Sequence, residues 1–499
     1  MAGATCGSLA VAFQLSRRRS SARRPTSMRS RSSPAPYAWW MVFAGWLVYG
    51  FGISPGYYSW GQFLPATLTD LDLTRAEGGL VFGLFTVAYQ CSSPLVGLAL
   101  QRFGVRATMT AGAVVAAAGF LVMNRADSLA DCLLGFSLLA GLGIGLGTIL
   151  PTQTLATNWF HRYRATALAL MMTAGGVVGK LVPRIDAWML AEHGWRTGWL
   201  LLAGISGAVA VFALAFIRSS PEEVGLLPDG LRAEDGGGAE ARNAEPVGLG
   251  GEEHSGGGPG EARRHDVGGG AREIAGADDG GSARAVRPVT RDPDWSAADA
   301  LRTPQFAVLA LCGIAFAVPW GVVVAHGMLH FGDRGIPTAV AGGIIGWMVL
   351  VSIAGRLSAF LGDLMAPQRL LGLALLVEAL GLLGLTLAAS SGLALAGGIV
   401  FGLGFGTAYV SVSAVFGAFF GRRAFAVTAG TRMMITGVVN AFAPWAAGLV
   451  ADRTGSYVPA LLPIAAVTVA GAIAAVLSKP PARRETERIE TALPAAPRP

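Results

Sequence analysis

Twelve hydrophobic runs, separated into two sets of six by a polar, glycine-rich stretch, constrain the fold of this 499-residue chain. A helix that crosses about 30 Å of hydrocarbon needs about 20 apolar residues, because each residue adds about 1.5 Å. The runs occupy 38–63, 78–100, 107–124, 130–156, 165–190, 197–217, 304–329, 338–361, 369–389, 392–416, 424–451 and 456–478. The sequence therefore predicts an all-α membrane protein with twelve transmembrane helices in two six-helix bundles.

The composition indicates that a lipid bilayer surrounds most of the chain. Apolar residues make up 53% of the sequence and charged residues 14%, and the mean hydropathy is +0.52. A soluble protein of this composition would expose too much apolar surface to water. No GxxxxGK[ST] phosphate loop, cysteine–histidine cluster or catalytic constellation is present in the sequence. We therefore expect no enzyme activity, no bound cofactor and no metal site.

The arginine distribution predicts the orientation in the membrane. Residues 1–36 contain seven arginines and no acidic residue, and the C-terminal tail is also basic. With an even number of spans both termini lie on one side, and the positive-inside rule places them in the cytoplasm. We read the net charge of +7 as this topology signal and not as a nucleic-acid site. A multi-pass protein of the plasma membrane is expected, although residues 1–36 also fit an organelle targeting segment or an upstream start before Met28.

The same patterns predict the domain organisation. Residues 219–300 are rich in Gly, Ala, Glu, Asp and Arg and contain few large apolar residues, so burial cannot offset their chain entropy. We expect them to form a disordered cytoplasmic linker. The full expectation is a disordered basic tail at 1–36, six-helix bundles at 37–218 and 301–479, this linker, and a disordered tail at 480–499.

Short motifs repeat between the halves and resemble a known family. Gly141-Leu-Gly143-Ile-Gly145 is echoed by Gly402-Leu-Gly404-Phe-Gly406. The loop after the second run, Gly97-Leu-Ala-Leu-Gln101-Arg102-Phe103-Gly104-Val105-Arg106, resembles the signature of the major facilitator superfamily of secondary transporters, with Gln101 where that family has an acid. The second-half counterpart runs from Gly355-Arg356 to Gly362-Asp363 and keeps the acid. The resemblance implies alternating access between two bundles and a gating role for Gly97, Arg102, Gly104, Arg106 and Asp363.

Further motifs are similar to the monocarboxylate and oxalate/formate group of that superfamily. They are Trp159-Phe160 followed by Arg164-Ala165, then Gly194-Trp195-Arg196, Gly355-Arg356 and the stretch from Gly448 to Tyr457. The likeness implies a substrate that is a small mono- or dicarboxylate, and an Arg356 that contacts it. Ser352 stands one turn before Arg356, where proton-coupled relatives have an acid, so the sequence lacks that route for a coupled proton.

Ionised side chains inside the runs are the next candidates, because each costs at least about 2.5–3.5 kcal/mol at the centre of a membrane helix. Lys180 is one of two lysines in the chain, and Arg184 lies one turn beyond it. With Arg356 they predict a cationic site for an anion. The alternatives are that Lys180 and Arg184 extend to the interface, and that Arg356 serves gating or packing. Arg432 lies close enough to the end of its run that an interfacial position and a functional role both remain open, and Glu378 belongs to a run expected at the bundle periphery.

Uncharged polar residues inside the runs complete the predicted substrate site: Tyr57, Tyr58, Gln62, Tyr89, Gln90, Gln153, His326 and Asn440. Each could instead form a hydrogen bond between packed helices. His326 could carry a proton or be bonded within its own bundle.

The favoured function is a monomeric secondary transporter of a small organic anion. An exporter of amphipathic compounds and a membrane sensor with a transporter fold are the alternatives.

Overall fold

The computed structural model describes residues 36–160, 163–232, 295–358 and 365–481. Its first half contains α2 (Pro36–Leu71), α3 (Arg75–Cys91), α4 (Ser93–Asn124), α5 (Leu129–Cys132), the π-helical η1 (Leu133–Ala140), α6 (Gly141–Gly147), α7 (Ile149–Trp159) and α8 (Arg164–Phe216). Its second half contains α10 (Ala297–Leu301), α11 (Pro304–Asp333), α12 (Thr338–Leu357), α13 (Pro367–Thr386), α14 (Ser391–Thr454) and α15 (Val458–Leu477).

Twelve membrane crossings account for nearly all of these helices, as the sequence predicts. Nine helical stretches of the described residues are long and apolar enough to span a bilayer. One of them, Thr166–Phe216, turns back at Gly194 and makes two crossings. The helices α2 and α3 supply the remaining two. Gly194 and Gly421 have φ values of 80° and 70°, a backbone region that favours glycine, and each turns a long helix between two crossings.

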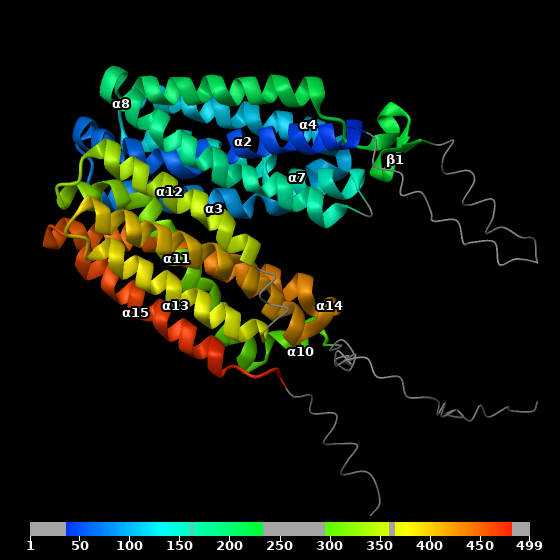
Figure 1. The fold of residues 1–499 in the computed structure, drawn as a ribbon. Helices are drawn as coiled ribbons and strands as arrows, with labels where there is room; N and C mark the ends of the chain where they lie inside the picture. Colours follow the sequence, from blue (N-terminus) through cyan, green and yellow to red (C-terminus); the bar gives the residue numbers. More distant parts are fainter. Residues whose placement is uncertain (1–35, 161–162, 233–294, 359–364, 482–499) are drawn as a thin grey trace, which may run out of the picture.

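The crossings form two six-helix bundles that lie side by side (Figure 1). Three helix pairs make most of the contact between the bundles, because α2 packs against α11, α3 against α14, and α8 against α12, and a smaller contact joins α3 to α11. The remaining helices pack mainly within their own half, for example α4 against α8 and α13 against α14 and α15. A site between the halves is therefore built from these six interface helices.

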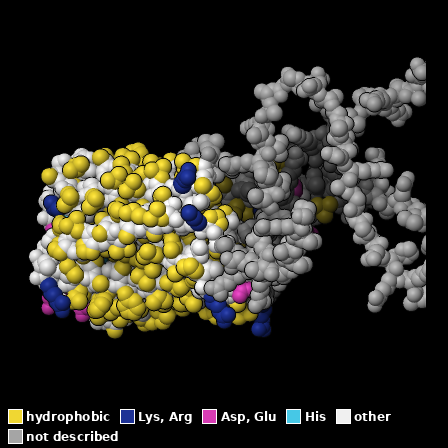
Figure 2. Space-filling model, turned by 90° about the horizontal axis from the view of Figure 1, so that it is seen from below, with side chains coloured by type: hydrophobic (Ala, Val, Ile, Leu, Met, Phe, Trp, Pro, Cys, Tyr) yellow, Lys and Arg dark blue, Asp and Glu magenta, His cyan; other side chains and the backbone are white. Residues whose placement is uncertain are grey.

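The surface of the bundles suits a hydrocarbon environment. Figure 2 shows apolar side chains spread over the face seen from below, with lysine and arginine side chains toward its two ends. Large apolar side chains such as Val211, Leu214 and Ile473 remain exposed on this kind of surface. Such a surface is stable where lipid replaces water.

The two ends of the expected disordered linker have secondary structure, which corrects that expectation in part. A 3-10 turn, η2 (Pro221–Val224), leads into an antiparallel pair, β1 (Leu226–Leu227) and β2 (Leu231–Arg232), joined by η3 (Pro228–Gly230). Ser219 fixes the start, because its hydroxyl accepts a hydrogen bond from the backbone N–H of Arg106 at 3.2 Å. At the other end, α10 precedes α11. The middle of the linker, 233–294, and most of both tails lie outside the described residues.

Candidate functional site between the two halves

The halves make their closest contact where α3 meets the second crossing of α14. Gly79 and Gly83 of α3 lie directly against the backbone carbonyls of Pro444 and Ala441, and Gly448 of α14 lies against the carbonyl of Arg75. A side chain at any of these glycines would collide with backbone. Small residues allow membrane helices to approach at backbone distance. By the predicted orientation, this contact closes the outer side.

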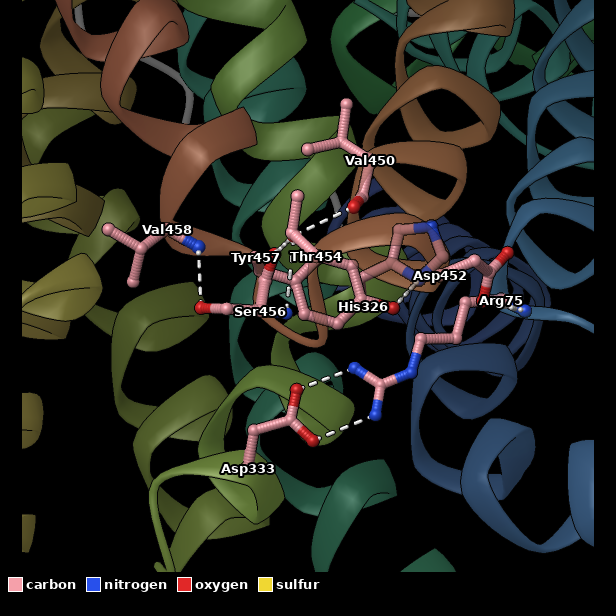
Figure 3. A network of polar contacts seen from close by, with 9 residues as sticks. All are labelled: Arg75, His326, Asp333, Val450, Asp452, Thr454, Ser456, Tyr457 and Val458. Atoms are coloured by element: carbon pink, nitrogen blue, oxygen red, sulfur yellow. Dashed lines mark hydrogen bonds and ion pairs between the residues drawn. The ribbon is translucent and has the colours of Figure 1, made fainter.

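An ion pair and a helix cap from opposite halves reinforce this contact (Figure 3). The guanidinium of Arg75 donates two hydrogen bonds to Asp333, Nη1 to Oδ2 at 2.5 Å and Nη2 to Oδ1 at 2.8 Å. Bonding to Asp333 raises the pKa of Arg75, so the guanidinium stays charged. Asp452 accepts the backbone N–H groups of Arg75 and Ala76 at 3.0 and 2.9 Å. Two carboxylates of the second half therefore hold the N-terminus of α3.

His326 takes part in the packing behind this ion pair. Its Nε2 lies 2.8 Å from the carbonyl oxygen of Pro444, and its Nδ1 lies 3.0 Å from the hydroxyl of Tyr457. Because a carbonyl only accepts, Nε2 carries a hydrogen and Nδ1 of the neutral ring accepts from Tyr457. Arg75 lies over the Tyr457 ring at 5.3 Å. The structure thus places His326 in a network within its own bundle, beside the outer closure.

Deeper between the halves, Arg356 of α12 lies beside Tyr409 of α14. The guanidinium carbon is 5.0 Å from the centroid of the Tyr409 ring, which remains 43% exposed. The Nε atom of Arg356 is buried and has no hydrogen-bond partner among the described residues. Tyr49 and Tyr58 of α2 are among the side chains near Arg356. One cation in the last turn of α12 and tyrosines of both halves therefore form one group between the halves, which is called the centre below.

Aromatic side chains of α2 and α3 form the first-half wall of this centre. Tyr57 packs edge-on against Phe85 and Tyr89, with ring centroids 5.7 and 5.6 Å apart, and Tyr89 is stacked on Phe85. Tyr58 lies at the junction of Gly179 of α8 with α12. The sequence predicts Tyr57, Tyr58 and Tyr89 as residues of the substrate site. In the structure they lie on α2 and α3, in the half opposite the one that carries Arg356.

Two tyrosines of this centre, Tyr49 and Tyr409, are missing from the sequence-based prediction. A signal for Tyr409 exists in the glycine motif. Gly402 and Gly406 lie against the backbone of α12, and Tyr409 follows at the helical spacing that continues the same face. That periodicity points Tyr409 toward Arg356. We find no comparable signal for Tyr49.

A second cation lies on the second crossing of α14. Arg432 is 6% exposed, and its guanidinium carbon lies 6.0 and 5.8 Å from the rings of Phe316 and Phe416. Of the two alternatives left open for Arg432, the structure favours the inward position, because the side chain packs against α11. Asn440, two turns further on, is also buried and packs against Gly321 with its Oδ1 unpaired in the described part of the chain.

Lys180 and Arg184 lie away from Arg356. The Lys180 ammonium nitrogen is 3.2 Å from the centroid of the Trp347 ring, at the seam between α8 and α12. Gly346 packs against the Lys180 backbone, and Arg356 lies ten residues further along α12, or about 15 Å by helix rise. Arg184 is exposed, on a lipid-facing row of α8 with Leu181 and Trp188. The structure therefore does not bring these cations together with Arg356.

The remaining predicted residues have diverse surroundings. Gln62 is fully buried against Gly342 of α12, and neither of its amide atoms has a partner among the described residues. Gln153 is exposed. Gln90 is half-buried and lies beside Gly437.

The predicted gating residues of the first half stay within that half. Gly104 has a φ of 76° and ends the first part of α4, and Arg106 donates from Nε to the carbonyl of Leu214 at 2.7 Å. Arg102 is exposed over Phe103, and Gly97 has open space beside it. Asp363 lies outside the described residues.

The described residues contain no group of three histidine, cysteine, aspartate or glutamate side chains that could hold a metal ion. The described residues offer two cations in aromatic settings whose buried Nε atoms lack partners, Arg356 between the halves and Arg432 within the second half.

Comparisons with known proteins agree with this architecture. A nucleoside transporter structure, NupG, has a TM-score of 0.61 at 12% identity, over 88% of this chain and 99% of that chain. The MFS-type transporter YhjX of Escherichia coli, itself uncharacterized, is 24% identical over 196 residues, 39% of this chain and 48% of that protein. Monocarboxylate transporter 13 of Bos taurus is 28% identical over 185 residues, 36% of this chain and 42% of that protein.

The chain thus spans less than half the length of either curated relative. The family model matches more of it: the model described as Major Facilitator Superfamily covers residues 46–365, well over half of the sequence. This chain belongs to the Major Facilitator Superfamily.

Proposed function

We propose that the protein is a secondary active transporter that moves a small mono- or dicarboxylate across the plasma membrane by alternating access, without changing it chemically. The observation that carries the proposal is Arg356, whose buried Nε lacks a partner among the described residues. No described carboxylate lies within ion-pair distance of it. An arginine in such a place needs an anion, and its planar guanidinium binds a carboxylate through two parallel hydrogen bonds.

The surroundings of Arg356 suit a small organic anion. The rings of Tyr409, Tyr57 and Tyr58 offer apolar faces for a short carbon chain and hydroxyl groups that can donate to carboxylate oxygens. The site receives side chains of both halves, as a transporter site at the interface of two repeats requires. The monocarboxylate relative, which matches part of the chain, supports the same substrate class.

The present conformation corresponds to the inward-facing stage of the proposed cycle. The contacts between α3 and α14 and the Arg75–Asp333 ion pair close the side that we assign to the exterior. Opening that side requires these contacts to separate while the cytoplasmic ends approach each other. We propose that both termini are cytoplasmic and that the protein acts as a monomer.

Two residues that the sequence predicts as substrate contacts, Lys180 and His326, are not assigned to the substrate in this proposal. Lys180 lies over Trp347 and would meet the substrate only if the seam between α8 and α12 opened. His326 serves the outer closure through Tyr457 and Pro444. Arg356, Tyr409, Tyr58 and Tyr89 are the residues that we assign to the substrate.

An exporter of amphipathic compounds is the second candidate, because the centre is rich in aromatic rings, including the stacked pair Trp320 and Phe405 with centroids 3.8 Å apart. Such a substrate would bind through the rings and would not depend on the Arg356 charge. Replacement of Arg356 therefore separates the two candidates.

The test is counterflow of labelled mono- and dicarboxylates into proteoliposomes, with Arg356→Lys compared with the wild type. Arg356→Lys keeps the charge but loses the two-point geometry, so carboxylate uptake should fall at least about tenfold. Arg453→Lys, at an exposed position on the outer end of α14, is the matched control and should transport normally. Wild-type affinity for a transported carboxylate in Arg356→Lys, with normal insertion, would place the anion site elsewhere.

A further inference from the structure

Asp186 is a carboxylic acid buried inside the membrane part of the first half. It lies on the first crossing of α8, is 1% exposed, and its Oδ2 has no hydrogen-bond partner among the described residues. It belongs to none of the ion pairs formed in the described part of the chain. An ionisable residue in a membrane helix is costly and generally serves a function. The anion site around Arg356 does not use it.

The neighbours of Asp186 are polar and equally buried. The hydroxyl of Ser59 on α2 lies near the carboxyl group and, like Oδ2 of Asp186, has no hydrogen-bond partner among the described residues. One turn further along α2, Gln62 is 0% exposed with both amide atoms unpaired in the described chain. A side chain built at Gly342 of α12 would lie 3.1 Å from the Gln62 amide oxygen and 3.4 Å from the Pro183 carbonyl. Gly342 of the second half therefore packs over the polar group formed by Asp186, Ser59 and Gln62 in the first half.

Nearby charged residues do not neutralise Asp186. On its own helix, Lys180 is directed to Trp347 and Arg184 is exposed. The facing segment of α12, residues 338–352, contains no titratable residue. On α11, which packs against α2, His326 is bonded to Pro444 and Tyr457. On α2, Tyr58 faces Gly179 and α12.

With no cation beside it, an ionised Asp186 would be a bare charge in a medium of low dielectric constant. Burial of that kind strongly favours the neutral, protonated form of a carboxylic acid. The closed seam between α8 and α12 is therefore compatible with a proton on Asp186. When the outer side opens, Gly342 moves away from Gln62, water reaches the polar group, and the carboxylate can form.

We propose that Asp186 is a proton-binding site that takes its proton from the outer solution and must be loaded before the two halves close on that side. The inference rests on the proposed alternating-access function and adds the proton to it. The direction of the expected pH dependence follows from this assignment. A high outer pH removes the proton while the outer side is open, the charged carboxylate resists burial, and the return to the inward-facing state slows.

The first test measures carboxylate counterflow as a function of outer pH at a fixed inner pH. The wild-type rate should fall about tenfold per pH unit above its midpoint, because a single proton titrates. Asp186→Asn, which resembles the protonated acid in shape, should give a flat profile. Ser59→Ala removes a donor to the carboxylate, so its midpoint should move to higher pH.

Glu378→Gln is the matched control, because Glu378 is also a fully buried carboxyl group without a described partner, but lies on α13 within the second half. It should keep the wild-type profile. An Asp186→Asn profile that still falls with outer pH, or a flat Glu378→Gln profile, would overturn the proposal.

The second test measures how often the seam between α8 and α12 opens to the outer solution, and it needs no substrate. Val349 of α12 is buried at the seam, against Gly179 and Tyr58 of the first half. Val349→Cys, in a background with Cys6, Cys91, Cys132 and Cys312 replaced by Ser, is treated from outside with a membrane-impermeant thiol reagent. The pH dependence of the thiol itself cancels when Asp186→Asn in the same background is measured at each pH.

Labelling relative to the Asp186→Asn protein should rise severalfold as outer pH increases. A constant ratio across the pH range would refute the proton site. If the ratio rises while no carboxylate is transported, the proton site stands and the proposed substrate class fails, so the two results are distinguishable.

Discussion

Arg75 of α3 and Asp333 of α11 form a two-point ion pair across the junction of the halves, on the side assigned to the exterior, with N–O distances of 2.5 and 2.8 Å. Both side chains are 26% exposed, so water screens part of the attraction. The pair lies beside backbone contacts that already bring the halves together. In the proposed cycle, its contribution is therefore to the balance between outward-facing and inward-facing states and less to folding.

Breaking this ion pair should shift the protein toward the outward-facing state. Asp333→Asn and Arg75→Gln are each expected to change that balance by about 1 kcal/mol or less, and the double variant should add little to either single variant. Spin labels are attached at Glu192→Cys and Leu387→Cys, which are exposed near the outer ends of the two halves. The change should appear as a larger population of molecules with a longer distance between the two labels. Strictly additive shifts would show that the two residues act independently.

The glycine contact between α3 and α14 should tolerate no side chain. Gly83→Val would place methyl groups against the Ala441 carbonyl, so the outer side should fail to close and counterflow should be lost. Binding of substrate from the outside should persist. Gly343→Val is the control, because Gly343 is exposed with no atom within 4 Å of the added carbon. Normal counterflow by Gly83→Val would contradict a closed state of this geometry.

The Tyr409 ring should contribute to anion binding by holding Arg356 in place. Tyr409→Ala removes the cation–π contact at 5.0 Å, which is worth about 0.5–2 kcal/mol, and should weaken carboxylate Kd about 2- to 30-fold. Tyr409→Phe keeps the ring and should therefore bind the carboxylate more tightly than Tyr409→Ala. Equal Kd values for the wild type and Tyr409→Ala, by titration in detergent, would remove Tyr409 from the site.

A stability prediction concerns Pro319 inside α11. Proline has no backbone N–H, so the carbonyl of Ala315 lacks its helical partner, and the Thr468 hydroxyl of α15 shares its hydrogen between this carbonyl at 3.0 Å and that of Ile464 at 2.9 Å. Thr468→Val keeps the shape and loses this bond, which should lower the free energy of unfolding by about 0.6–1 kcal/mol. Thr468→Ser keeps the bond and is the comparison in a thermal unfolding series. A Thr468→Val variant as stable as the wild type would show that the hydrogen bond is not needed.

The sequence specifies the crossings much better than it specifies the site. Length and hydropathy locate a membrane helix, because the bilayer fixes how many apolar residues are required. They do not fix the rotation of each helix about its axis, which depends on packing against neighbours. Lys180 and Arg432 illustrate the difference: Lys180 faces Trp347 at a seam, whereas Arg432 is buried among Phe316 and Phe416.

Uncharged site residues are harder to predict from the sequence than charged ones. Tyr49 joins the centre only because the two halves pack against each other, which no pattern local to α2 encodes, whereas the glycine spacing of α14 does signal Tyr409. The ends of the linker show the converse limit. A composition poor in apolar residues predicts disorder, yet a serine, a glycine at positive φ and a short strand pair suffice to order residues 219–232.

The helix cap at the start of α3 gives the outer closure a spectroscopic signature. Thr74 of the first half satisfies the N–H of Glu77, whereas the N–H groups of Arg75 and Ala76 are satisfied by Asp452 of the second half. The first turn of α3 is therefore completed only while the halves touch. Each excursion to the outward-facing state should leave those two amides to water, and their deuterium uptake would record how often the protein opens, without label or substrate.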